Sequence, residues 1–103
     1  MSVVALLSVA PVIEDSMASE VAAAVEALES FDVAYETNPM GTVIEADDIE
    51  TLLAAVGAAH KAVDADRVST FLKIDDKRTR DQHAEEKVTA VERELGRDAK
   101  KER

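Results

Sequence analysis

The chain begins with the seven-residue run Val3–Val9, in which only Ser8 is polar. Side chains of a strand alternate between two faces, so Val3 and Leu7 face one way while Val4 faces the other. Both faces therefore need burial, which is typical of a central strand. The run is much shorter than the roughly 20 residues that span a bilayer. It predicts a layered domain built around this strand, which we expect Pro11 to end.

Two amphipathic helices are predicted after this strand. Ser16 can cap the first helix, whose apolar stripe consists of Met17, Val21, Ala24, Val25 and Leu28. Asp47 and Glu50 form a capping-box-like start for the second helix, whose stripe consists of Ile49, Leu52, Leu53, Val56 and Val63. Stripes of this kind are typical of core-facing helices. Gly57 predicts close helix–sheet packing. His60 is expected to be packed or hydrogen-bonded rather than bound to metal, because no second histidine stands at i±4.

The segment Tyr35–Glu45 predicts two short strands joined by a turn at Asn38–Gly41. It concentrates a phenol, two hydroxyls, a thioether and a carboxylate in a chain with 3% aromatic residues. Side chains of these types beside a turn can hold a small molecule. An ordinary polar hairpin is the alternative interpretation.

The last two elements complete a strand–helix–strand–strand–helix–strand order. Val68–Asp75 predicts a strand, and Ala84, Val88, Val91 and Leu95 form a narrow apolar seam on a last helix that ends at Gly96. This is the ferredoxin-like βαββαβ pattern of an α+β sandwich, with an added C-terminal helix. We expect both main helices on one face of a four-stranded antiparallel sheet whose first and third strands are central. Residues 1–96 form the predicted domain, and residues 97–103 a charged tail.

One face of this predicted sheet has no helix to cover it. The first strand is apolar on both faces, and Phe71 is expected on the uncovered face, so a monomer would expose an apolar patch. We therefore expect this face to be buried in a homodimer or homotetramer, with the seam of the last helix taking part.

The chain is acidic, with a formal net charge of −10. Residues 1–66 hold 13 acids and one base, whereas residues 67–103 hold 9 acids and 11 bases. An acidic surface repels nucleic acid and anionic membranes, so neither is expected as a partner. The composition also suits a halophilic, high-salt cytoplasm. The chain has no cysteine, which excludes disulfides and thiolate metal sites and indicates a cytoplasmic location.

Several segments resemble the small thiamine-binding (YkoF-like) proteins, namely Tyr35, Pro39–Glu45, His60 and Lys73–Arg78. The similarity covers roughly residues 3–95. It implies a ferredoxin-like subunit that assembles as dimers or tetramers and binds thiamine or its hydroxymethylpyrimidine part without turnover. The ligand-binding residues expected from this resemblance and from the hairpin are Tyr35, Thr37, Met40, Gly41, Thr42, Glu45 and Asp75.

The leading functional hypothesis is a non-catalytic binding protein that acts as a carrier, buffer or sensor in thiamine salvage. No cofactor and no metal is expected. A small ferredoxin-like dimeric enzyme is one alternative, since such folds also host catalysts. The sequence shows neither a Ser-His-Asp order nor a glycine-rich phosphate loop. An oligomeric regulatory module that senses another metabolite is the second alternative.

Overall fold

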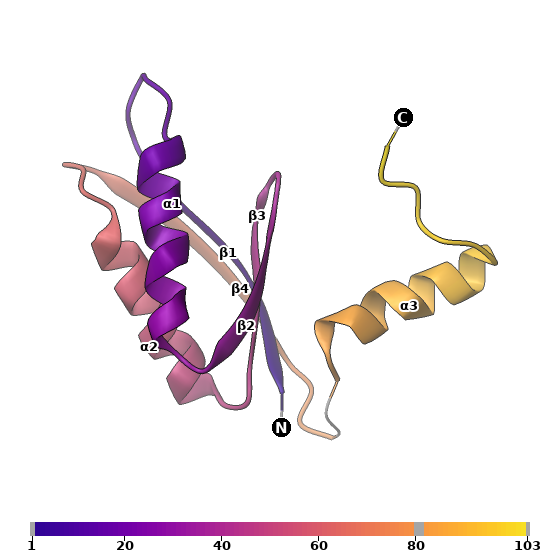
Figure 1. Ribbon diagram of the computed structural model, residues 1–103. Helices are drawn as coiled ribbons and strands as arrows, with labels where there is room; N and C mark the ends of the chain where they lie inside the picture. Colours follow the sequence, from indigo (N-terminus) through magenta and orange to yellow (C-terminus); the bar gives the residue numbers. More distant parts are fainter. Residues whose placement is uncertain (1, 80–81, 103) are drawn as a thin grey trace.

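The computed structural model describes residues 2–79 and 82–102, so Met1, Arg80, Asp81 and Arg103 lie outside the described part of the chain. Its elements follow the predicted order (Figure 1). They are β1 (Val3–Pro11), α1 (Ala18–Ala27), the 3₁₀ turn η1 (Leu28–Ser30), β2 (Val33–Asn38), β3 (Gly41–Ala46), α2 (Ile49–Ala62), β4 (Val68–Asp76) and α3 (Ala84–Leu95). The ferredoxin-like α+β fold with an added C-terminal helix is confirmed. In the described residues, no helix combines the length and the apolar character needed to cross a bilayer.

The sheet is antiparallel throughout, with strand order β2-β3-β1-β4. β1 and β3 are therefore central, as predicted. β1 ends at Pro11, as predicted, and Pro11 itself lies opposite Val68 as the last pair of the β1–β4 ladder. Proline lacks only the N–H group, and the amide of Val12 resumes the pairing by donating to the Arg67 carbonyl at 2.8 Å.

The core lies between the sheet and the pair α1 and α2, which cover one face (Figure 1). Along β1 every second residue is buried, in the period of two expected for a strand. The largest fully buried side chains are Leu28, Ile44 and Leu52, from η1, β3 and α2. The core is thus built from both helical segments and the central strands.

The start of α2 differs from the capping box predicted at Asp47. Asp48 is the cap, because its backbone is extended and its carboxylate accepts a hydrogen bond from the Thr51 amide at 2.7 Å. That bond lowers the pKa of Asp48 below its ordinary value. The capping pair is therefore shifted by one residue, since Asp48 and Thr51 have the same spacing as Asp47 and Glu50.

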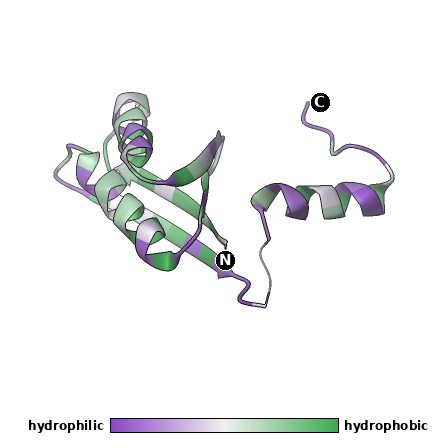
Figure 2. Ribbon diagram, turned by 60° about the horizontal axis from the view of Figure 1, so that its bottom comes forward, coloured by the Kyte–Doolittle hydropathy of each residue, from purple (hydrophilic) through white to green (hydrophobic). Residues whose placement is uncertain are grey.

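The second face of the sheet carries no helix along most of its length. This bare face, defined by Val4, Leu6, Val43 and Phe71, lies on the side away from α1 and α2. α3 lies on this side but extends away from the sheet (Figure 1). Polar and apolar residues alternate along the helix (Figure 2). None of its described residues is buried. It ends as predicted at Gly96, which has a φ of 73°.

Two glycines have different physical roles. A Cβ atom placed on Gly41 would lie 2.8 Å from the carbonyl oxygen of Leu7, so its absence lets β3 approach β1. A Cβ atom on Gly57 would have no neighbour within 4 Å. The predicted close packing at Gly57 is therefore wrong, and this position exposes only the intrinsic cost of glycine in a helix.

This contrast predicts opposite effects of one substitution. Gly41→Ala should lower the free energy of unfolding by about 1–3 kcal/mol, because the new methyl group meets backbone that cannot move aside. Gly57→Ala should raise it by about 1 kcal/mol. Urea unfolding followed by circular dichroism gives both values. Equal effects of the two substitutions would contradict the difference in packing.

Candidate ligand-binding site

A pocket of about 170 Å³ lies between α1 and the turn that joins β2 to β3. Thr37–Thr42 of the hairpin form one wall, and Val21 and Val25 of α1 together with its N-cap residue Met17 form the other. We call it the hairpin pocket. Met17 remains 41% exposed although it belongs to the apolar stripe of α1. This stripe therefore lines a pocket as well as the core.

Two hydroxyl groups meet at this pocket. Thr37 and Thr42 lie directly opposite each other in the β2–β3 ladder, and their Oγ1 atoms are 3.2 Å apart. Thr42 is 5% exposed, whereas Thr37 faces solvent. Only one of the two O–H groups is needed for their mutual hydrogen bond, so the pair retains a further donor and several acceptor lone pairs. These can pair with a polar edge of a bound molecule.

The turn itself contributes Met40 and Gly41. Met40 is 84% exposed, so its flexible thioether lies at the rim of the pocket. Gly41 lines the pocket too, but the contact that requires a glycine is the one with Leu7 described above. The sequence alone assigned this glycine to a close approach by a ligand.

Tyr35 lies in an adjoining hollow of about 440 Å³ between α1 and β2. This hollow shares Val21, Val25 and Thr37 with the hairpin pocket, so the two lie next to each other. The phenol of Tyr35 donates a hydrogen bond to the Glu29 carboxylate at 2.5 Å. That bond, reinforced by burial and by the negative charge of Glu29, raises the pKa of Tyr35 above 10.0. Glu29 thus brings a carboxylate to the site that the sequence alone did not identify.

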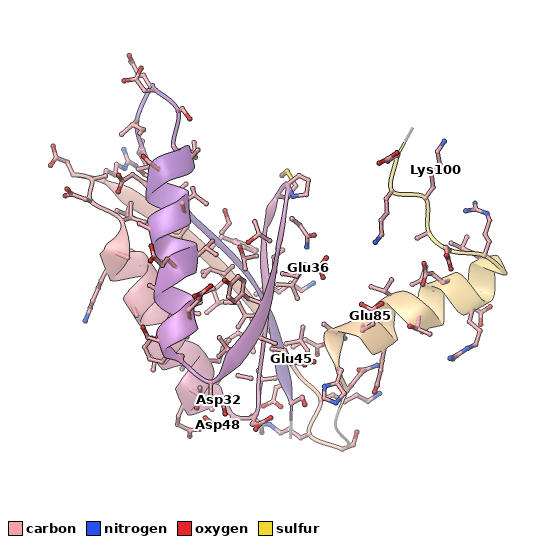
Figure 3. The ribbon with its side chains drawn as sticks, viewed as in Figure 1. Asp32, Glu36, Glu45, Asp48, Glu85 and Lys100 are labelled. Carbon is pink, nitrogen blue, oxygen red and sulfur yellow. The ribbon has the colours of Figure 1, made fainter. Side chains whose placement is uncertain are left out.

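The remaining two predicted residues lie on the opposite face of the sheet. Glu45 accepts a hydrogen bond from the Ala84 amide at 2.8 Å and pairs with Nδ1 of His83 at 3.1 Å. Asp75 pairs with the Lys87 ammonium group, which lowers the pKa of Asp75. Both carboxylates therefore hold the first turn of α3. Figure 3 shows Glu45 on the same side as Glu36 and the α3 residue Glu85.

The seven predicted site residues are thus divided between two faces. Tyr35, Thr37, Met40, Gly41 and Thr42 gather at the hairpin pocket and its adjoining hollow. Glu45 and Asp75 lie across the sheet from them. Within residues 2–79 and 82–102, no group of three potential metal-binding side chains comes together. The hairpin pocket and the adjoining hollow are therefore lined by hydroxyl, phenol, carboxylate and apolar groups.

These features define a ferredoxin-like α+β domain with a pocket beside its β2–β3 hairpin. The sequence model of the family described as thiamine-binding protein matches residues 5–92. The chain belongs to this family, and the resemblance inferred from its hairpin and last strand is confirmed.

Individual relatives agree with this assignment. A UPF0045 protein of Methanothermobacter thermautotrophicus is 49% identical over 83 residues, which cover 78% of this chain and 84% of that protein. The crystal structure of MJ1052 from Methanocaldococcus jannaschii superposes with a TM-score of 0.81 at 38% identity, covering 87% of this chain and 95% of that one. A Thermotoga maritima protein provisionally assigned to thiamine biosynthesis or salvage has a TM-score of 0.77 at 26% identity, covering 88% of this chain and 99% of that one.

Because the Tyr35–Glu29 hydrogen bond raises the pKa of Tyr35, we expect the phenol to titrate at a higher pH than a free tyrosine. Tyr35 is the single tyrosine and the chain has no tryptophan, so ultraviolet absorbance reports this group alone. Tyrosinate should appear at higher pH than in a free tyrosine, and Glu29→Gln should move the midpoint back toward 10.0. Because the folded-state pKa is the higher one, the stabilisation is complete below the unfolded pKa and is lost as pH rises through the folded value. A wild-type midpoint at or below 10 would refute the hydrogen bond.

Proposed function

We propose that this protein binds thiamine or its hydroxymethylpyrimidine part in the hairpin pocket, without turnover, as a carrier, buffer or sensor in thiamine salvage. The family assignment and the Thermotoga maritima relative support a thiamine-related role. The observation that carries the proposal is the Thr37–Thr42 hydroxyl pair at the edge of an apolar pocket. Such a pocket suits a flat ring with polar substituents.

The pocket volume favours one ring rather than a larger molecule. An apolar cavity of about 150 Å³ is known to hold benzene, and the hairpin pocket measures about 170 Å³. An aminopyrimidine carries donors and acceptors on its edge, which the hydroxyls of Thr37 and Thr42 can pair with. Met40 at the rim can pack on the face of the ring.

The adjoining hollow suits the thiazolium part of thiamine. Thiazolium is a permanent cation, and the hollow is lined by Glu26, Glu29 and the ring of Tyr35. Carboxylates attract a cation, and an aromatic face adds a cation–π contribution. The two adjacent pockets can thus take one ring of thiamine each, whereas the pyrimidine alone would occupy only the first.

Glu45 and Asp75 take no direct part in this proposal. Both are engaged with the first turn of α3 on the other face. A non-catalytic role is supported by the positions of the two histidines. Nδ1 of His60 lies 2.5 Å from the hydroxyl of Thr70, and His83 pairs with Glu45, so both are occupied away from the pocket.

Titration calorimetry with thiamine and hydroxymethylpyrimidine tests the site. Thr42→Val preserves the shape of the side chain but leaves a ligand group unpaired, so it should weaken binding of both ligands by about 1–3 kcal/mol. Tyr35→Ala removes an aromatic face and should weaken thiamine binding roughly fivefold. It should weaken binding of the pyrimidine less, because the pyrimidine does not reach the hollow.

Two controls distinguish a wrong site from a wrong ligand. Thr89→Val makes the same change on α3, away from the pocket, and should leave binding unchanged. Glu45→Gln should also leave it unchanged. If wild type gives no heat at millimolar ligand, the proposed function fails. If wild type binds but Thr42→Val binds equally well, only the hairpin pocket fails.

We further propose that the protein forms a homodimer or homotetramer through its bare face and works in the cytoplasm. Phe71 is 58% exposed on that face, and Leu6 lies two rows away with no helix above it. Exposed apolar groups gathered on one face are typical of an interface. The lack of cysteine in the sequence agrees with a reducing compartment.

Light scattering measures this association directly. At micromolar concentration the mass should be at least twice the 11.1 kDa of one chain. Phe71→Glu places a charge on the bare face, so it should weaken the association and lower the measured mass. A wild-type monomer at every salt concentration would refute self-association and would leave the binding proposal intact.

A further inference from the structure

The hairpin pocket and the adjoining hollow differ in charge, although they lie next to each other. Among the residues that the structure describes, no lysine, arginine or histidine lines either of them. The lining of the hairpin pocket, over the same part of the chain, holds no charged side chain of either sign. The hollow has two, and both are carboxylates, Glu26 of α1 and Glu29 of η1. A bound molecule therefore meets neutral surroundings in the pocket and negative ones in the hollow.

The wider surface around both pockets has the same negative sign. Both are built from side chains between positions 7 and 42, and this segment holds seven acids and no base. A surface with a large excess of one charge attracts ions of the opposite sign and repels ions of the same sign. An anionic ligand is therefore disfavoured before it reaches either pocket.

The N-terminus of α1 lies beside the hairpin pocket, and a helix N-terminus is a feature that can bind phosphate. Met17, the N-cap residue of α1, lines the pocket. Carboxylates already surround this terminus, because Glu20 stands in its first turn and Glu14 and Asp15 precede the helix. Negative side chains at such a position interact favourably with the helix dipole and offset its attraction for another anion. The terminus therefore does not reverse the preference against anions.

We propose that the site selects the unphosphorylated forms of its ligand and rejects the phosphorylated ones. A phosphate ester carries a charge of about −1.5 to −2 at pH 7, so it converts thiamine from a cation into a molecule of negative net charge. The phosphate of thiamine monophosphate is attached to the side chain of the thiazolium ring, so it would lie near Glu26 and Glu29. The inference rests on the proposed function and adds the chemical form in which the ligand is bound.

The hairpin pocket rejects a phosphorylated pyrimidine for a different reason. A phosphate group on the hydroxymethylpyrimidine would enter a pocket lined by apolar side chains, hydroxyls and amides. Removing a charged group from water is costly when no opposite charge pairs with it. The Thr37 and Thr42 hydroxyls can donate hydrogen bonds, but they carry no charge. The pocket therefore favours the neutral pyrimidine without the help of the carboxylates in the hollow.

Glu29 is the specificity-determining residue of the hollow. The phenol of Tyr35 donates to its Oε1 atom at 2.5 Å and so fixes the position of the carboxylate. A carboxylate has about four acceptor positions, and the phenol occupies one of them. Glu29 therefore keeps both its charge and most of its acceptor capacity for a cation, and it meets an anion with the same groups.

Titration calorimetry of the full chain with thiamine, thiamine monophosphate and thiamine diphosphate tests the selection. Wild type should bind thiamine about tenfold or more tightly than the monophosphate, and the diphosphate most weakly of the three. The preference should shrink as KCl rises from about 0.1 M to about 1 M, because salt screens charges. A preference that does not change with salt would overturn the proposed role of charge.

A set of substitutions locates the selection in the hollow. Glu29→Gln removes the charge but keeps an oxygen that can accept the Tyr35 hydrogen bond. The side chain is exposed, so the preference for thiamine over its monophosphate should fall modestly, by about threefold. Glu26→Lys brings a cation into the hollow and should reduce the preference further. Glu94→Gln removes the same charge from an exposed position on α3, across the sheet from both pockets, and should leave the preference unchanged. Equal effects of Glu29→Gln and Glu94→Gln would overturn the role of the hollow.

The pyrimidine provides an independent comparison. Wild type should bind hydroxymethylpyrimidine about tenfold or more tightly than its phosphate, and Glu29→Gln should leave this ratio unchanged. Equal binding of the two would overturn the selection by the hairpin pocket. If wild type binds thiamine and thiamine monophosphate equally well, the selection fails and the proposed function stands. If it binds neither thiamine nor the pyrimidine, both fail.

Discussion

The structure depends on a strand that is paired at both edges and apolar on both faces. β1 takes its hydrogen bonds from β3 on one side and β4 on the other. α1 and α2 bury one of its faces, and among residues 2–79 and 82–102 no helix covers the other in the same way. An apolar surface left in water is unfavourable in proportion to its area. Whatever lies on the second face of β1, including α3, can therefore stabilise the fold by covering its apolar side chains.

Side chains alternate between the two faces along each strand, so the position of a residue in the strand decides which face of the sheet its functional group lies on. Thr42 and Glu45 are three residues apart on β3, so they point to opposite sides of the sheet. Thr42 joins Thr37 at the hairpin pocket, and Glu45 caps α3. Residues that form one cluster in the sequence thus serve two different surfaces. The carboxylate that accompanies the pocket comes from Glu29, on the turn that follows α1.

Most of the fold could be predicted from the sequence because its signals are local and periodic. The alternation in β1, most of the helical stripes and Gly96 each correspond to an observed feature. Leu53, predicted in the inner stripe of the second helix, is instead 49% exposed. The predictions were wrong where two adjacent residues satisfied the same local rule. They were also wrong where the role of a residue depends on a contact with another part of the fold. Asp47 and Asp48 offer the same capping chemistry one residue apart. The role of Gly41 depends on Leu7, and the partner of Tyr35 depends on how η1 leads into β2, so neither could be derived from spacing.

The alternation also makes the two surfaces separable by experiment. A side-chain change at Thr42 alters the hairpin pocket and leaves the bare face untouched, while a change at Phe71 does the reverse. A change at Gly41 acts differently, because it moves the backbone of β3 against β1 and both surfaces are carried by these strands. If the chain binds a ligand and self-associates as proposed, loss of both together would be the signature of a displaced strand. Loss of one alone identifies the surface that was altered.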